Sequence, residues 1–443
     1  MPSSTGLWSR AAGVAAQTPA SRNRYVDFLR ALSILIVIIG HWLAAAPYAA
    51  GGQLVLSSML EHQRWTHLLS WMLQIMPVFF IVGGYSNGVT WKAAVRDNKT
   101  YAEWLNGRLQ RLAGPVLPLL VAWIILGIGA HLFGARPETV KFGSQAALIP
   151  IWFLAVYVGV VLVVPLTYAA WRRFGMKSFW ALAIAVAVDD YLFFAAGLHG
   201  AGWFNYAFIW LAVHQLGYAW RDGKLQSGYP ALLWTVSGLG ILIALVVIGP
   251  YPLAMVSVPG EAVSNSLPPK LPMLLLGMIQ IGLALTFEAP MRRWLERPRP
   301  WTATVMVNSM IMTSFLWHLT ASTIVIGIAL QLGNIGLAIT PGSGTWWATR
   351  PIWLGVYSLV LAGFVLVFGI FERGGGSGRP AAAWRQIAGA VLMCGGLSFL
   401  ALDGIGGTGW LGLRWWAVSL PIAGAALAGV NPLIARSKAN SAA

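Results

Sequence analysis

Long apolar segments alternate with short polar stretches along the whole chain, and segments of this length predict helices rather than strands. Twelve such segments can be recognised, and each is close to or above the roughly 20 residues that a helix needs to cross a bilayer. They are residues 27–46, 66–90, 113–133, 147–170, 178–197, 202–220, 231–251, 271–289, 302–331, 351–371, 385–403 and 414–434. The pattern predicts an all-α, polytopic integral membrane protein.

The composition supports this fold class. Of the 443 residues, 58% are hydrophobic and only 9% are charged, whereas a soluble domain carries about 25% charged residues. The net charge of +16 would suggest nucleic-acid binding in a soluble protein, but here the basic residues fall in short loops between apolar segments. The single cysteine, Cys394, excludes an internal disulfide and a cysteine-based metal site.

The distribution of basic residues predicts the orientation of the chain. If the N-terminus is cytoplasmic and the segments alternate, most lysines and arginines lie on the cytoplasmic side, as the positive-inside rule requires. The exceptions are Arg64, Arg136, Lys141, Lys270, Arg350 and Arg414. This interpretation places both termini in the cytoplasm and the protein in the cell (inner) membrane.

The sequence predicts one membrane core, followed by a linker and a further helix pair, with a short tail at each end of the chain. Residues 24–372 hold ten segments, residues 373–383 form a glycine-rich cytoplasmic linker, and residues 384–434 form a further helix pair. Residues 1–23 lack a sustained apolar run, so we expect a mobile cytoplasmic tail there, and residues 435–443 form a second tail. No loop is long enough to hold a soluble domain.

Arg30 and His41 carry the strongest functional signal, because ionisable residues inside a membrane segment are rare and point to function. Eleven steps along an α-helix advance about 16 Å and complete about three turns, so both side chains lie on one face. Asp27 stands one turn before Arg30. A histidine in this place suits proton transfer near neutral pH. The alternative is that Arg30 extends to the interface and His41 bonds a neighbouring helix.

Arg108 and Arg111 are three residues apart, so they share one face of a helix. They precede Gly114 and Pro115, where the third apolar segment begins. Two guanidinium groups at a membrane surface can each bind phosphate oxygens bidentately. The alternative is anchoring of the membrane helix by positive charge, which spacing alone favours.

Several other polar residues lie within the apolar segments. Trp317 and His318 suit either a substrate pocket or a buried structural contact, and the same holds for His214. Asp189 and Asp190 suit either the orientation of a hydroxyl-bearing acceptor or a solvated helix end.

Residues 79–85, Phe-Phe-Ile-Val-Gly-Gly-Tyr, combine aromatic rings with two adjacent glycines. Adjacent glycines let a helix or a ligand approach the backbone closely. Helix packing alone would explain the pattern in most membrane proteins.

These motifs, in this order, resemble the membrane acyltransferase-3 family, whose members acylate sugars and other hydroxyl-bearing envelope or secondary-metabolite molecules. Arg30 and His41 match its arginine–ten–histidine motif, and Arg108 and Arg111 match its cytoplasmic arginine pair. Residues 79–85 are similar to its Phe-Phe-x-x-Ser-Gly-Phe/Tyr signature, with Gly83 in place of the serine. Further similar stretches are residues 25–31, 151–154 and 316–318, and the resemblance covers residues 22–372.

The resemblance implies an acyl-CoA donor, usually acetyl-CoA, that enters from the cytoplasm and requires no metal. It implies that Arg108 and Arg111 meet the CoA phosphates and that His41 deprotonates the acceptor hydroxyl. Arg30 would position the donor or stabilise negative charge, and both direct transfer and an acyl-histidine intermediate fit the motifs. The residues expected to line the substrate site are Asp27, Tyr85, Trp152, Trp317 and His318.

A transporter or flippase for a lipid-linked sugar is the main alternative, with the polar track from Arg30 to His41 as its permeation path. Transporters often contain two related halves, and no such repeat is visible in this sequence. A non-catalytic scaffold would leave Arg30 and His41 without a role. Consumption of acyl-CoA separates the enzyme from both alternatives.

Overall fold

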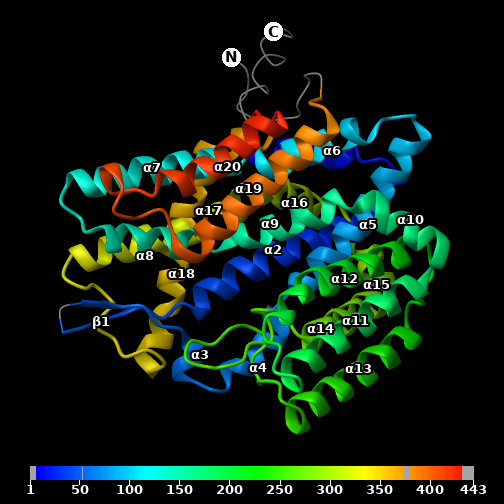
Figure 1. The fold of residues 1–443 in the computed structure, drawn as a ribbon, viewed down its shortest axis with the longest axis horizontal. Coiled ribbons are helices and arrows are strands. Elements are labelled where there is room, and N and C mark those ends of the chain that lie inside the picture. The colour runs from blue at the N-terminus through cyan, green and yellow to red at the C-terminus, as the bar shows by residue number, and fades with distance from the viewer. Residues whose placement is uncertain (1–5, 52, 374–379, 432–443) are drawn as a thin grey trace. The chain divides into compact units, whose positions relative to one another are not determined.

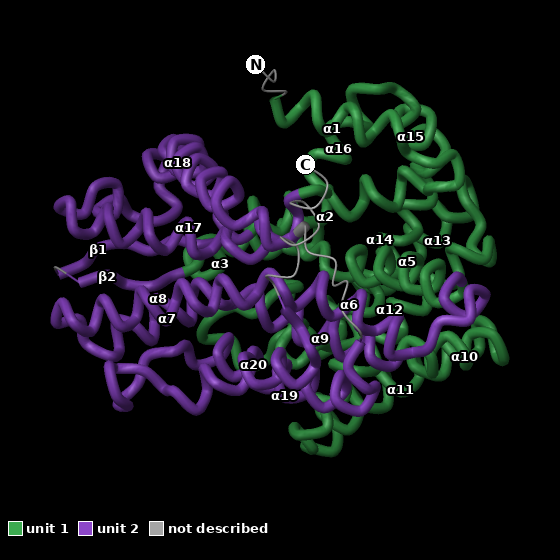
Figure 2. The backbone as a smooth tube through the Cα atoms, turned by 90° about the horizontal axis from the view of Figure 1, so that it is seen from above, with its two compact units in different colours: residues 1–40, 58–92, 164–309 green, residues 41–57, 93–163, 310–443 purple. Residues whose placement is uncertain are grey.

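The computed structural model describes residues 6–51, 53–373 and 380–431, and helices dominate these ranges (Figure 1). The all-α fold class is therefore confirmed. The chain divides into two compact units, and Figure 2 colours them separately. Unit 1 contains residues 1–40, 58–92 and 164–309, and unit 2 contains residues 41–57, 93–163 and 310–443.

Seven helical stretches among the described residues are long and apolar enough to cross a membrane, or nine if two bent helix pairs each count as one span. Every predicted apolar segment overlaps a helix. The number of spans is lower than the number of segments, partly because Met176–Phe194 carries Lys177, Asp189 and Asp190, and because Asn205–Arg221 has only 17 residues. The protein is a multi-pass membrane protein.

Unit 1 consists of helices, and its longest connection is the loop of residues 249–270 between α13 and α14. The helix α2 (Arg24–Ala44) begins in this unit and ends in unit 2, as does α5 (Met76–Arg96). The other elements of unit 1 are α1 (Leu7–Ala16), α3 (Met59–His62), α4 (Thr66–Leu73), α10 (Val164–Phe174), α11 (Met176–Phe194), the 3₁₀ helix η1 (Ala201–Phe204), α12 (Asn205–Arg221), α13 (Tyr229–Ile248), α14 (Leu271–Thr286), α15 (Glu288–Leu295) and α16 (Pro298–Asn308).

Unit 2 contains the remaining helices and one small hairpin, in which β1 (Tyr48–Ala50) pairs antiparallel with β2 (Gln53–Val55). Its helices are α6 (Tyr101–Ala113), α7 (Val116–Leu132), α8 (Pro137–Leu148), α9 (Pro150–Leu162), α17 (Ile311–Gln331), α18 (Gly344–Phe368), the 3₁₀ helix η2 (Gly369–Arg373), α19 (Ala383–Asp403), the 3₁₀ helix η3 (Trp410–Gly412) and α20 (Trp415–Ala428).

The structure differs from the sequence-based expectation near the N-terminus. Residues 7–16 form α1 instead of a mobile tail, and α1 packs against α16. The indole Nε1 of Trp301 donates to the backbone oxygen of Ala15 at 3.2 Å and to the hydroxyl of Thr18 at 3.0 Å. Ala11 and Ala15 of α1 are buried, so its packing against α16 covers part of its apolar surface. Most of the expected glycine-rich linker and the whole tail 435–443 lie outside the described residues.

Local sequence signals explain where two functionally relevant helices begin. Thr100 and Glu103 form a capping box at the start of α6, because each side chain accepts a hydrogen bond from the backbone NH of the other residue. The carboxylate of Glu372 accepts hydrogen bonds from the backbone NH groups of Met312 at 2.9 Å and Thr313 at 3.0 Å. A carboxylate at these positions stabilises the start of α17 through its unpaired NH groups and its dipole.

Candidate active site

His41 on α2 and His318 on α17 form a pair in unit 2. Nδ1 of His41 lies 2.9 Å from Nε2 of His318, and the two rings stack with their centroids 5.1 Å apart at an interplanar angle of 20°. The His318 side chain is completely buried. His41 and His318 therefore form a hydrogen-bonded pair. The sequence had indicated them separately, His41 as a base and His318 as a residue that lines the substrate site.

The hydrogen bonds of His318 assign the protons of the pair. Nδ1 of His318 lies 2.6 Å from the backbone oxygen of Phe315, and a carbonyl oxygen can only accept. Neutral His318 thus carries its proton on Nδ1 and accepts at Nε2, so the Nδ1–H of neutral His41 donates to it. This leaves Nε2 of His41 unprotonated, which is the state that a general base requires.

Aromatic residues fix the position of the pair. The indole Nε1 of Trp42 donates to the backbone oxygen of His318 at 3.0 Å, and its ring lies 5.4 Å from that of Tyr357 on α18. Two residues beyond His318, the hydroxyl of Thr320 accepts a hydrogen bond from the indole of Trp123 on α7 at 3.0 Å. These contacts join α2, α7 and α18 to α17, so the imidazole rings have little freedom to reorient.

Trp317 and Trp152 occupy different surroundings from His318. The Trp317 ring stacks on Phe368 at 4.0 Å between centroids and lies 4.7 Å from Phe364, so it is packed into α18. Trp152 lies beside Phe153, whose ring is 5.5 Å from that of Phe315. A role for either tryptophan in substrate binding stays a prediction.

In unit 1, the carboxylate of Asp27 accepts hydrogen bonds from two arginines. Nε of Arg22 lies 2.5 Å from one oxygen, and a terminal nitrogen of Arg30 lies 2.6 Å from the other. The Asp27 side chain is only 6% exposed, and its backbone oxygen accepts from Asn308 at 2.9 Å. The cluster is fixed to α16 and carries a net positive charge. Arg22 was not among the predicted site residues.

Tyr85 and the glycines of residues 79–85 belong to a tight helix crossing in unit 1. The phenol of Tyr85 accepts a hydrogen bond from the side-chain amide of Asn23 at 3.1 Å. A Cβ on Gly84 would overlap the backbone oxygen of His214, and a Cβ on Gly217 would overlap that of Ile81. Gly84 therefore serves the close approach of α5 and α12, which is the packing alternative for this motif.

Arg108 and Arg111 both lie on α6, as the sequence predicts. The Arg108 guanidinium lies over the ring of Trp104 at 5.7 Å from its centroid. Arg111 is exposed, whereas Gln110 between them is buried. The two arginines thus occupy the outward part of α6, where a large anion can reach Arg111 directly.

The carboxylates of Asp189 and Asp190 are buried, which argues against the solvated helix end, one of the two alternatives for this pair. Asp190 accepts hydrogen bonds from Asn205 at 2.9 Å, from Tyr251 at 2.9 Å and from the backbone NH of Leu271 at 2.7 Å. Burial lowers the pKa of the neighbouring Lys270 ammonium, and Asp190 and Asp189 oppose that shift.

His214 is likewise buried, and it contacts α5. Its Nε2 lies 3.1 Å from the side-chain amide nitrogen of Asn87 on α5, which donates to it. Together with the Gly84 crossing, this contact ties α12 to α5 within unit 1.

Arg350, one of the basic residues expected on the outer side, lies in the second turn of α18 and is 6% exposed. Its guanidinium lies 4.0 Å from the ring centroid of Trp346 and 5.3 Å from that of Trp353. Trp346 and Trp353 stand four residues before and three residues after Arg350, and this helical spacing could have indicated from the sequence that Arg350 packs between aromatic rings.

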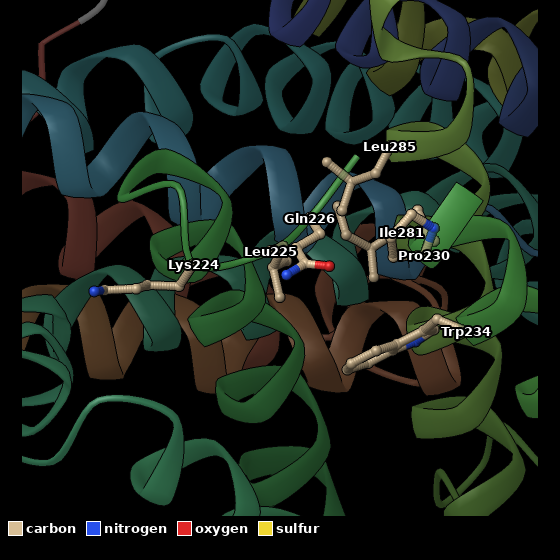
Figure 3. Close-up of a pocket in the computed structure, with 9 residues that line it drawn as sticks. Lys224, Leu225, Gln226, Pro230, Trp234, Ile281 and Leu285 are labelled. Carbon is tan, nitrogen blue, oxygen red and sulfur yellow. The ribbon is translucent and has the colours of Figure 1, made fainter. Parts of the chain in front are cut away.

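A cavity of about 270 Å³ in unit 1 is lined by none of the predicted site residues (Figure 3). The loop before α13 contributes Lys224 and Gln226, and the side chain of Lys224 extends away from the rest of the group. The other residues around the cavity are Leu225, Pro230, Ala231, Trp234, Ile281, Gly282 and Leu285. The cavity is mostly apolar and contains no candidate base.

The family model described as an acyltransferase domain (Acyl_transf_3) matches residues 23–372, well over half of the chain. The chain belongs to the acyltransferase-3 family. No curated protein and no solved structure matches it. As a member of this family, the protein is a multi-pass membrane acyltransferase, which favours the enzyme over the transporter alternative. The acyltransferase domain ends at residue 372, so α19 and α20 lie beyond it.

Proposed function

We propose that this acyltransferase transfers an acyl group, most simply acetyl, from cytoplasmic acyl-CoA to a hydroxyl group of an outward-facing acceptor. The acceptor class is a sugar, a glycolipid or another envelope or secondary-metabolite molecule. The observation that carries the proposal is the His41–His318 pair, because its hydrogen bonds leave a lone pair on Nε2 of His41. A neutral imidazole held in this way is suited to remove a proton from a hydroxyl.

The chemical step then follows in order. Nε2 of His41 takes the hydroxyl proton, and the acceptor oxygen forms a bond with the thioester carbonyl carbon. The resulting tetrahedral species collapses by breaking its carbon–sulfur bond, and the proton on His41 passes to the departing CoA sulfur. Throughout, His318 accepts the hydrogen bond from Nδ1 of His41 and stabilises the imidazolium that forms.

Donor binding is assigned to the basic residues. Arg108 and Arg111 contact the CoA phosphates through charge-assisted hydrogen bonds, while Arg30, held by Asp27, positions the donor or stabilises negative charge. The three arginines lie within the range that the family model matches, and the exposure of Arg111 supports access for a bulky anion. Tyr85, Trp152 and Trp317 are proposed to line the path of the substrates.

The central test is His41→Ala in the purified full-length protein. Label transfer from radiolabelled acetyl-CoA to a panel of sugars and membrane glycolipids, and release of free CoA thiol, report turnover. CoA affinity is measured separately by calorimetry. We expect turnover to fall by about 10²-fold or more, because a general base contributes at least that factor, while CoA affinity stays within about twofold. Turnover within about tenfold of wild type would remove His41 from the mechanism.

A further inference from the structure

The helices α19 and α20 lie beyond the acyltransferase domain, but they are integral parts of unit 2. They pack side by side (Figure 1), and α19 also packs along α6, α8 and α9. We call these two helices, residues 383–428 with the backbone through Asn431, the terminal hairpin.

The terminal hairpin is a closely packed helix pair. A Cβ on Gly389 would overlap the backbone oxygen of Gly424, and a Cβ on Gly424 would in turn overlap that of Gly389. Further along α19, a Cβ on Gly396 would clash with Pro421 of α20. Small residues at these crossings let the two backbones approach closely, as is common between membrane helices. The hairpin can therefore act as one rigid element.

The hairpin binds α6 at two places. The side chain of Gln110 donates to the backbone oxygen of Gly429 at 2.7 Å and accepts from the backbone NH of Asn431 at 3.0 Å. Eight residues earlier on α6, the backbone oxygen of Ala102 accepts from the side-chain amide of Gln386 at 3.0 Å. Gln110 and Gln386 are 7% and 0% exposed, so these hydrogen bonds are not readily replaced by water.

The position of Gln110 gives this contact a functional meaning. It stands between Arg108 and Arg111, and successive helical residues point about 100° apart. A Gln110 side chain fixed against the hairpin therefore fixes the rotation of α6 about its axis, and with it the direction of both guanidinium groups. If this anchor were lost, α6 could rotate and the two arginines would spend less time in the orientation that binds phosphate.

We propose that the terminal hairpin is a positioning element for the acyl donor, and that Gln110 is the positioning residue that couples it to Arg108 and Arg111. The proposal rests on the assignment of these arginines to CoA binding. It gives the helix pair outside the family domain a role in donor affinity rather than in the chemical step.

The same hairpin offers a matched control at its opposite end. The side chain of Gln145 on α8 donates to the backbone oxygen of Leu402 at 2.5 Å. This is also an amide-to-backbone contact with the hairpin, but it involves neither α6 nor the arginines. Gln145→Ala removes a more exposed hydrogen bond between the same chemical groups, and it leaves the contacts of α6 intact.

The experiment compares Gln110→Ala, Gln386→Ala and Gln145→Ala in the full-length protein, with the Kd for CoA measured by calorimetry. We expect Gln110→Ala to raise the Kd about threefold to tenfold, which corresponds to the loss of one or two buried hydrogen bonds. Gln386→Ala should have a smaller effect in the same direction, and Gln145→Ala should leave the Kd within about twofold. A merely destabilised protein would lose active fraction, and hence binding stoichiometry, at an unchanged Kd.

The variant Arg108→Gln/Arg111→Gln separates the two ways in which the proposal can fail. If this variant binds CoA weakly while Gln110→Ala binds like Gln145→Ala, the positioning role of the hairpin is wrong and the donor site stands. If this variant binds CoA as tightly as wild type, the donor site itself is wrong, and the role of the hairpin falls with it.

Discussion

His41 and His318 are 277 positions apart in the chain, yet Nδ1 of one lies 2.9 Å from Nε2 of the other. The backbone oxygen of Phe315 holds the far nitrogen of His318, so the pair has a defined direction of hydrogen bonding. This arrangement resembles the general pattern in which a second group orients a catalytic imidazole and stabilises its charged form. Removal of the His318 side chain should therefore lower turnover without changing CoA affinity.

We expect His318→Ala to lower turnover about 10- to 100-fold while CoA affinity is retained. The physical reason is that Nδ1–H of His41 loses its acceptor, so the imidazole can adopt the wrong tautomer or rotate away. His318→Gln retains a hydrogen-bonding side chain at this position and should recover part of the activity. Radiolabelled acetyl transfer measures both variants. Wild-type activity in both variants would show that His318 is not needed to orient His41.

Replacing both Arg108 and Arg111 with Gln should weaken CoA binding and have a smaller effect on turnover at saturating donor. Each charge-assisted contact contributes about 1.5–3 kcal/mol to binding. Calorimetry with CoA and with dephospho-CoA measures the change, and the double variant should discriminate less between the two ligands. Intact affinity combined with poor membrane insertion would instead support the anchoring alternative for these residues.

Sidedness is the third prediction. Sealed vesicles of known orientation carry acetyl-CoA on the cytoplasmic side and a membrane-impermeant acceptor on the other side. Acetylated acceptor should form, because CoA is a bulky anion that cannot cross the apolar core and the basic loops are expected at the cytoplasmic face. Product that forms only when both substrates share the cytoplasmic side would contradict transfer across the membrane but not the acyltransferase activity.

Gly84→Ala should destabilise the protein, because the added Cβ overlaps the backbone oxygen of His214. Overpacking at a close helix crossing typically costs about 1–3 kcal/mol. Thermal unfolding in detergent measures the loss as a lower midpoint temperature. Gly129→Ala on α7 is the matched control, since a Cβ there meets no atom within 4 Å, and its midpoint should not fall.

The sequence predicts the helices of the core well, because long apolar segments in a membrane protein have few alternatives to helix. It also predicts His41 as the principal candidate base. It does not predict the partner of His41, since nothing in local spacing brings together residues 277 positions apart. Trp317 and His318 are neighbours in sequence but point in different directions on α17, and only His318 meets His41.

Two further differences between the expected and the observed helices concern α6 and α1. The helix α6 was expected only as a motif of two arginines, although the Thr100–Glu103 capping box marks its beginning. The order of α1 depends on contacts with Trp301, which are tertiary and cannot be read from residues 7–16 alone.

The proton arrangement of the histidine pair has a consequence for the energetics of the whole reaction. The end of the pair at Phe315 is closed by a carbonyl oxygen, so a proton accepted at Nε2 of His41 has no exit through His318. On the proposed mechanism it leaves from the same atom, to the CoA sulfur, and the enzyme returns to its starting state after each turnover. The acyl group would then cross the bilayer without net charge movement, and neither a pH gradient nor a membrane potential would drive or oppose it.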